Sequence, residues 1–66
     1  MKNKRMKIAR VERDLSQEQL AERVGATRQT IGMIEAGKYN PSLKLCLAIC
    51  KVLGRTLDEL FWEDEQ

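Results

Sequence analysis

The sequence predicts an all-α protein, a single compact domain of five short helices that spans residues 1–66. Apolar residues recur three and four positions apart, which is the period of a helix with one buried face. Serine, threonine and glycine, which cap helices, separate these periodic stretches at short intervals. Patterns typical of strands are nearly absent. A chain of 66 residues is near the lower size limit for a domain without disulfides or metals.

The first helix is expected over residues about 3–13. Met6, Ala9, Arg10 and Arg13 recur there at helical spacing and therefore share one face. Arg10 is a charged residue on a face that otherwise points inward, so it requires a separate explanation.

Two further helices, joined by a tight turn, are expected within residues about 17–36. Ser16 and Gln19 have the spacing of a capping box at the start of the first of them. Gly25 stands where a left-handed residue commonly closes a helix, and Thr27 can cap the next helix two residues later. The apolar positions that give the pair its buried faces are Leu20, Ala21, Val24, Ile31 and Ile34.

Ser42 is expected to cap a fourth helix, roughly residues 43–53, which Gly54 ends. Thr56 is expected to cap a short fifth helix, roughly residues 57–61. The tail after it leaves two alternatives open, because residues 60–66 could continue as helix or form a short strand against the N-terminal residues.

Apolar positions from every helix are expected to form the core: Met6, Ala9, Leu15, Leu20, Ala21, Val24, Ile31, Ile34, Leu43, Cys46, Ile49, Cys50, Leu53, Leu57 and Leu60. The fourth helix is richer in apolar residues than one buried face requires. Leu45, Leu47 and Val52, with Phe61 and Trp62 near the chain end, imply a second apolar surface.

On so small a domain, a second apolar surface is more often a subunit contact than bare surface. We therefore expect a homodimer through Leu47, Val52, Phe61 and Trp62. The alternative is that Leu47 or Val52 is one of the scattered exposed apolar residues that are common on proteins.

The short turn within residues about 17–36 makes its two helices cross at roughly 90–120°. One end of the second helix is then free to enter a DNA major groove, which is about 12 Å wide. Arg28 can donate twice to guanine, and Gln29 can pair with adenine through both ends of its amide. Met33 lies on the same outward face, so these three residues are expected to contact bases.

Phosphate contacts are expected from polar side chains at the two helix starts and in the loop that follows. These residues are Gln17, Thr27, Thr30, Lys38, Tyr39 and Asn40. Tyr39 has an equally good alternative, which is to pack under the loop.

This stretch resembles the helix-turn-helix of the Cro/CI (Xre-like) family of transcriptional regulators, in particular its small, stand-alone bacterial and phage members. The residues that carry the resemblance are Gln17, Leu20, Ala21, Val24, Gly25, Gln29, Ile31, Ile34 and Glu35. The resemblance continues through residues 37–42 and ends in residues 57–61, so it covers nearly the whole chain. Ala9, smaller than the usual leucine, and Gly32, which removes a side chain near the bases, depart from the family pattern.

The resemblance implies a sequence-specific regulator, a repressor, that binds a palindromic operator in double-stranded DNA as a homodimer. It also implies that Arg10 and Glu35 pair and so tie the first helix to the end of the third. The alternative for these two residues is a pair of independent surface charges.

The distribution of charge agrees with a nucleic-acid partner. All 12 basic residues lie within residues 1–55, against five acidic ones, and the remaining five acidic residues lie within residues 56–66. A basic body with an acidic tail is expected if one end of the protein faces DNA. Two solvated charged faces are the alternative.

Other classes of function lack the residues they need. The chain has no histidine, no glycine-rich phosphate loop and no nucleophile beside a base, so we expect neither an enzyme nor a cofactor. No apolar run reaches membrane-spanning length and none is typical of a signal peptide, so a cytoplasmic protein without a membrane or small-molecule partner is expected. Cys46 and Cys50 are too few for a structural zinc site, and small core side chains are the favoured interpretation over redox sensing.

Two alternative functions use the same fold. One is an antitoxin or a restriction–modification controller, which binds DNA by the same chemistry. The other is a protein-interaction domain that has lost DNA binding. The polar segment Thr27–Thr30 argues against that loss, because acidic or bulky apolar residues would then be expected there.

Overall fold

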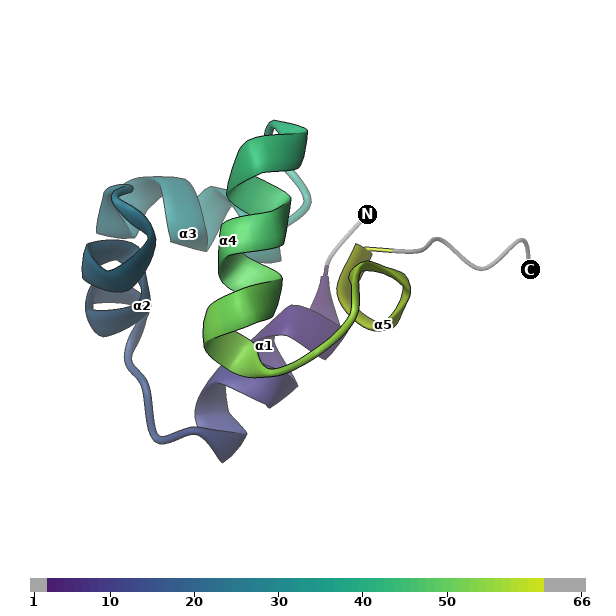
Figure 1. Cartoon of the computed structure of the whole chain (residues 1–66). Helices are drawn as coiled ribbons and strands as arrows, with labels where there is room; N and C mark the ends of the chain where they lie inside the picture. Colours follow the sequence, from purple (N-terminus) through teal and green to yellow (C-terminus); the bar gives the residue numbers. More distant parts are fainter. Residues whose placement is uncertain (1–2, 62–66) are drawn as a thin grey trace.

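The computed structural model describes residues 3–61, and five α-helices lie within them (Figure 1). Their bounds are Lys4–Glu12 for α1, Gln17–Val24 for α2, Arg28–Glu35 for α3, Leu43–Leu53 for α4 and Leu57–Phe61 for α5. Residues 3–61 contain no strand, so the predicted all-α class is confirmed. The alternative strand of the tail falls on positions outside the described residues, apart from Leu60 and Phe61, which belong to α5. No helix in the described part of the chain has the length and hydropathy of a membrane span.

The helix ends form where capping chemistry places them. The Ser16 hydroxyl accepts from the Gln19 backbone N–H at 3.0 Å, and the Gln19 side chain accepts from the Ser16 N–H at 2.8 Å. Thr56 and Glu59 repeat this reciprocal pair at the start of α5. Gly25 closes α2 at a φ of 74°, in the left-handed region that a side chain rarely adopts.

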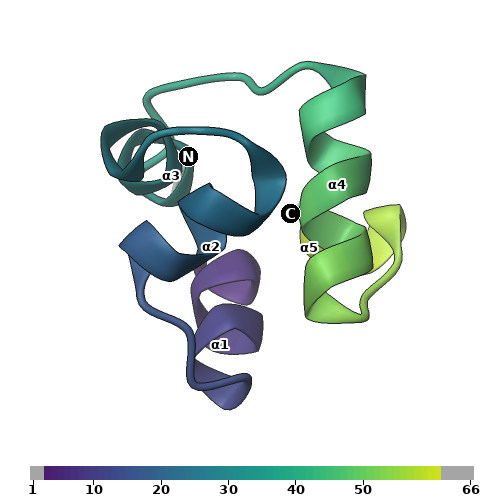
Figure 2. The ribbon, with the colours of Figure 1, turned by 60° about the vertical axis from the view of Figure 1, so that its left-hand side comes forward.

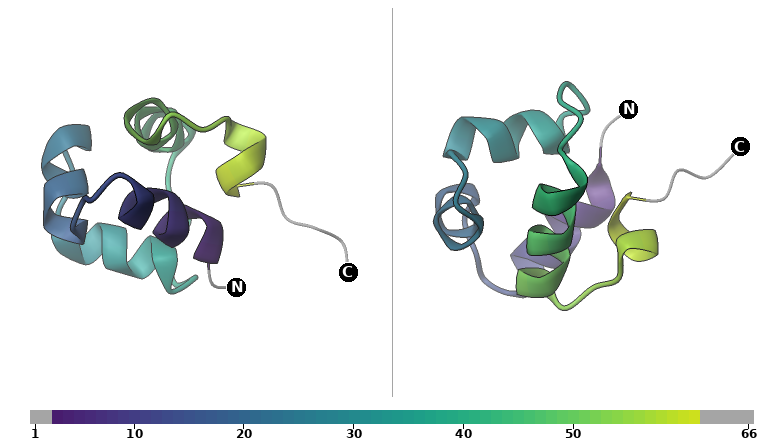
Figure 3. Two further views of the ribbon diagram at one scale, coloured as in Figure 1. Left: turned by 90° about the horizontal axis from the view of Figure 1, so that it is seen from below. Right: turned by 45° about the horizontal axis from the view of Figure 1, so that its top comes forward.

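The helices pack around a single core. Figure 2 shows α2 between α3 and α4, and α2 contacts both of them. Figure 3 shows α1 alongside α3, with α5 near the N-terminal end of α1. Because α5 also contacts α4, the last helix covers the side of the core that α2 and α3 leave open.

Most of the predicted core is buried, and two predicted members are exposed. Leu43 is 63% exposed and Leu57 is 36% exposed, so both assignments were wrong. Each is the first residue of its helix, where no preceding turn covers the side chain; the buried residues follow one turn later, at Cys46 and Leu60. Val24 is half-buried and packs against the core.

The expected second apolar surface is only partly exposed. Leu45, Val52 and Phe61 are half-buried because they pack against the core of their own chain. Leu47 is 51% exposed, and with Leu43 it leaves an apolar strip on α4. Trp62 lies outside the described residues.

Candidate nucleic-acid interface

The outward face of α3 carries the residues that were expected to read bases. Ile31, Ile34 and Glu35 are buried, which fixes the rotation of the helix and turns the opposite face to solvent. Arg28 and Gln29 are exposed in its first turn, and Met33 is half-buried one turn later. Within residues 3–61, neither the Arg28 nor the Gln29 side chain has a hydrogen-bond partner, so their donors are available to a ligand.

Thr27 and Thr30 stand together at the start of α3. The Thr27 hydroxyl oxygen accepts from the Thr30 backbone N–H at 3.1 Å and lies 3.0 Å from the Thr30 hydroxyl. Capping therefore uses the Thr27 oxygen and leaves one hydroxyl hydrogen of the pair for an outside acceptor. A phosphate oxygen is an acceptor of this kind.

Lys38, Tyr39 and Asn40 follow α3 in an exposed loop. Tyr39 is 45% exposed, so the ring does not pack fully under the loop. The loop begins with Gly37 at a φ of 77°, which turns the chain sharply away from the end of α3. Lys38, the single lysine of this loop, therefore lies just beyond the end of α3. Its backbone N–H donates to the Met33 carbonyl at 2.9 Å.

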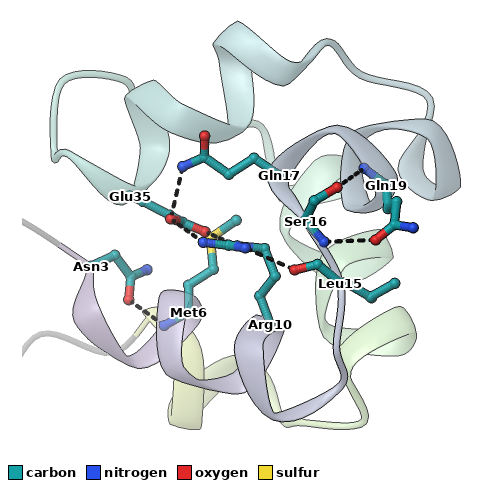
Figure 4. Close-up of polar contacts among 8 residues, drawn as sticks. All are labelled: Asn3, Met6, Arg10, Leu15, Ser16, Gln17, Gln19 and Glu35. Carbon is teal, nitrogen blue, oxygen red and sulfur yellow. Dashed lines mark hydrogen bonds and ion pairs between the residues drawn. The ribbon is translucent and has the colours of Figure 1, made fainter.

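Arg10 and Glu35 form a buried ion pair that joins α1 to the last residue of α3 (Figure 4). The Arg10 Nε donates to the Glu35 Oε2 at 2.8 Å, and Nη2 donates to Oε1 at 3.2 Å. Nη1 donates to the Leu15 carbonyl at 2.8 Å, so one guanidinium also holds the segment between α1 and α2. Both side chains are thus hydrogen-bonded within the protein, as a buried charge requires.

The side chain of Gln17 also has a partner inside the protein. Its Nε2 donates to the Glu35 Oε1 at 3.1 Å, in addition to the two donors from Arg10 (Figure 4). The sequence suggested only a phosphate contact for Gln17. Because glutamine Nε2 carries two hydrogens, the bond to Glu35 leaves one donor for a phosphate.

Gly32 lies in the middle of α3 and is half-buried. A Cβ added there would lie 3.6 Å from the Gln17 Oε1, which is an ordinary contact distance. An alanine side chain would therefore fit at this position without a steric clash.

Asn3 has a structural role that was not expected from the sequence. Its side-chain oxygen accepts from the Met6 N–H at 3.0 Å and so caps α1. Its backbone N–H donates to the Glu35 carbonyl at 2.9 Å, and its Nδ2 donates to the Leu60 carbonyl at 2.8 Å. The preference of asparagine for N-cap positions could have indicated the cap, but not the two long-range bonds.

The two cysteines are buried one turn apart on α4. Burial raises the pKa of both thiols, and for Cys50 the neighbouring Cys46 and Glu59 raise the pKa further. A raised pKa keeps the thiol protonated, whereas thiolates are the reactive and metal-binding form. Among residues 3–61 there is no cluster of three or more His, Cys, Asp or Glu side chains that could hold a metal.

Comparison with known proteins agrees with this geometry. The sequence model of the helix-turn-helix family matches residues 6–60. The uncharacterized HTH-type transcriptional regulator YgzD of Bacillus subtilis is 48% identical over 66 residues, which is 100% of this chain and 98% of that protein. The immunity repressor protein of Bacillus phage phi105 is 38% identical over 60 residues, 91% of this chain and 42% of the repressor.

A solved structure has the same fold. The crystal structure of the restriction-modification controller protein C.AhdI from Aeromonas hydrophila matches with a TM-score of 0.79 at 37% identity, over 86% of each chain.

Proposed function

We propose, from the premise that this chain belongs to the Cro/CI-type helix-turn-helix family of transcriptional regulators, that it is a repressor which binds a palindromic operator as a homodimer. The observation that carries the proposal is the exposed first turn of α3, where Arg28 and Gln29 have free donors on the face opposite the core. Two symmetry-related α3 helices would enter successive major grooves about 34 Å apart.

The proposed base contacts come from three side chains of α3. Arg28 would donate in bidentate fashion to guanine, and Gln29 would pair with adenine. Met33 would supply an apolar contact, of the kind that thymine methyl groups make in the major groove. Arg28 and Gln29 therefore carry most of the expected discrimination between sequences.

The proposed phosphate contacts flank these three residues on both sides. Thr27 and Thr30 would use the hydroxyl hydrogen that their mutual contact leaves free. Gln17 would use the second hydrogen of its amide nitrogen. Lys38, Tyr39 and Asn40 would hold the backbone from the exposed loop, with Lys38 supplying the positive charge of that loop.

The proposed dimer contact lies at the C-terminal end of the chain, on Leu47, Val52, Phe61 and Trp62. Leu47 has the largest exposed apolar area of the three described members, whereas Val52 and Phe61 would contribute the edges that their own core leaves uncovered. Leu43 and Leu57 extend the exposed apolar area on the same two helices and are added to the proposed contact. Repression would follow from occupancy of the operator.

The experiment that tests this function compares two DNAs. Binding sites are selected from random duplexes with the unmodified protein, and the affinity of each variant is then measured on the selected site and on mixed-sequence DNA. Arg28→Ala and Gln29→Ala should each cost about 1–3 kcal/mol per half-site on the selected site and much less on mixed DNA. Equal losses on both DNAs would assign these residues to phosphate alone, and the absence of any selected site would end the proposal.

Lys38→Ala is the control for lost charge. It removes one positive charge, as Arg28→Ala does, but from the proposed phosphate contacts. It should weaken binding to both DNAs similarly and lower the slope of log affinity against log salt by about one per bound subunit, or about two for the dimer.

The likeness to C.AhdI favours a second candidate, the control of a restriction–modification system. The same residues would bind DNA in that case. Mapping the bound sites in the genome separates the two candidates, because a controller would occupy the promoters of a restriction endonuclease and its methyltransferase.

A further inference from the structure

Asn3 lies where the ends of three helices meet. It caps α1 through Met6, and its backbone N–H satisfies the carbonyl of Glu35, the last residue of α3. Its side-chain amide satisfies the carbonyl of Leu60 in α5. One half-buried residue therefore holds the start of one helix and the ends of two others.

The hydrogen bonds of Asn3 continue through Glu35 into the candidate nucleic-acid interface. The Glu35 backbone holds Asn3, while its carboxylate accepts from Arg10 and from Gln17, the first residue of α2. An unbroken series of hydrogen bonds thus leads from α5 to the end of α3 and the start of α2.

We infer that Asn3 is a positioning residue that couples subunit pairing to operator binding. The inference rests on the proposed function, which places the dimer contact on α4 and α5 and the DNA contacts on α2 and α3. A movement of α5 on pairing shifts the Leu60 carbonyl, and Asn3 transmits that shift to the Glu35 carbonyl. By linkage, an operator that favours one placement of α3 favours the paired state by the same factor.

A second connection between α1 and the C-terminal part of the chain does not lead on to α3. Glu12 pairs with Arg55 at 2.8 Å, but the pair is exposed, and no hydrogen bond from it to α3 is present among residues 3–61. Exposed pairs of this kind are worth little. Glu12→Gln therefore serves as the matched control.

The test is Asn3→Ser. Serine keeps an acceptor for the Met6 N–H, as good N-caps do, but it is too short to reach the Leu60 carbonyl. With protein held well above its monomer–dimer constant, affinity for the selected site should fall about 10- to 100-fold, because the dimer loses two hydrogen bonds and each is worth about 3- to 10-fold. Affinity for mixed-sequence DNA should change less than about twofold, and Glu12→Gln should leave both affinities unchanged.

A second readout separates coupling from a purely structural role. In the unmodified protein, dilution through the monomer–dimer constant should shift the backbone amide NMR signals of both α5 and residues 35–37. In Asn3→Ser the shifts should remain in α5 and vanish at residues 35–37. If the serine variant fails to fold, Asn3→Asp keeps a strong cap and sets a carboxylate against the Leu60 carbonyl, with the same expected outcome.

Equal losses on the two DNAs, or dilution shifts that persist at residues 35–37, would overturn the coupling. Failure of the proposed function looks different. In that case the unmodified protein selects no site, or Arg28→Ala has no effect on the site that it selects.

Discussion

Arg10 is 8% exposed, and its guanidinium makes three hydrogen bonds, two to Glu35 and one to the Leu15 carbonyl. A buried pair of this kind recovers in attraction and hydrogen bonds roughly what it loses in hydration, so its net contribution to stability is small. The loss of one partner is a different matter, because the other charge is then buried alone.

Glu35→Ala should therefore destabilise the fold by about 3–5 kcal/mol, and Arg10→Met by a similar amount. The double variant Arg10→Met with Glu35→Leu should recover most of that loss, since no unpaired charge remains. Urea unfolding followed by circular dichroism measures all three. If the pair orients α3, the recovered double variant should still bind the selected DNA more weakly. A double variant as unstable as either single one would contradict the argument from unpaired charge.

Replacement of Gly32 is expected to change the free energy of unfolding in the opposite direction. Glycine in a helix interior costs roughly 1 kcal/mol relative to alanine, and an added Cβ meets Gln17 at an ordinary 3.6 Å. Gly32→Ala should raise the free energy of unfolding by about 0.5–1 kcal/mol. Gly25→Ala is the control and should lower it, because Gly25 has a φ of 74°. Thermal melting of both variants tests whether one is more stable and the other less stable than the unmodified protein. A destabilised Gly32→Ala protein would contradict the prediction.

The sequence predicted these residues unequally. The expected partnership of Arg10 with Glu35 came from the family resemblance, because a charged residue on an inward face does not name its partner. The bond from Gln17 to Glu35 went unpredicted, since its two residues are 18 positions apart and belong to different helices. The chemistry of single side chains indicates which groups need partners, whereas only the packing of helices determines which partner is within reach.

At the scale of the element, α4 shows how much of a helix the sequence can predict. Its bounds, Leu43–Leu53, are the ones expected from the Ser42 cap and Gly54. Its four buried residues, Cys46, Ile49, Cys50 and Leu53, were all expected in the core. The edge of the buried face was harder to predict, because apolar residues surround most of the helix: Leu43 was expected in the core and is exposed, and Val52 was expected on the second surface and is half-buried.

The buried face of α4 carries both thiols. Because their pKa values are raised, the folded state should lose stability as the pH becomes alkaline. A group whose pKa is higher in the folded state contributes fully below its unfolded pKa, and the contribution is lost as the pH rises. Stability should start to fall once the pH passes the ordinary thiol pKa. Urea unfolding from neutral to alkaline pH should show this decline, and it should be weaker in Cys46→Ala with Cys50→Ala. An identical decline in that variant would show that other groups cause it.

At the scale of the whole molecule, the proposed homodimer rests on the apolar side chains that α4 and α5 leave exposed. Leu47 is half exposed and makes little contribution to the core of its own chain. Leu47→Glu should therefore convert the proposed dimer to a monomer, weaken operator binding and leave the circular dichroism spectrum unchanged. Sedimentation equilibrium is the direct measurement. An unmodified protein that stays monomeric both alone and on DNA would contradict the dimer.

Val11 provides the control for that experiment. It is 54% exposed, but it lies on α1 and is not one of the residues of the proposed contact. Val11→Glu should leave both the subunit mass and operator binding unchanged. A monomer produced by Val11→Glu as well would place the subunit contact on α1.

The sequence predicted the helices of the molecule more completely than the long-range hydrogen bonds that tie the helices together. Caps and glycines gave all five helices, because each depends on neighbours within a few residues. The bond between Asn3 and Leu60 spans 57 positions and has no local pattern. The outward-facing side chains of α3 follow from the rotation of the helix, so they could be expected, whereas the long-range bonds that hold α3 in place could not.

That same bond also determines when α1 becomes tied to α5 during synthesis of the chain. Arg28, Gln29 and the loop after them emerge from the ribosome well before Leu60 does. Asn3, just before α1, can donate its side-chain amide to the Leu60 carbonyl only after residue 60 has been synthesised. The backbone N–H of the same residue holds the carbonyl of Glu35, at the end of α3. A nascent or truncated chain that stops short of α5 would therefore carry every proposed DNA-contacting residue of α2, α3 and the loop without the closure that fixes them. Operator binding should thus require a chain that extends through α5.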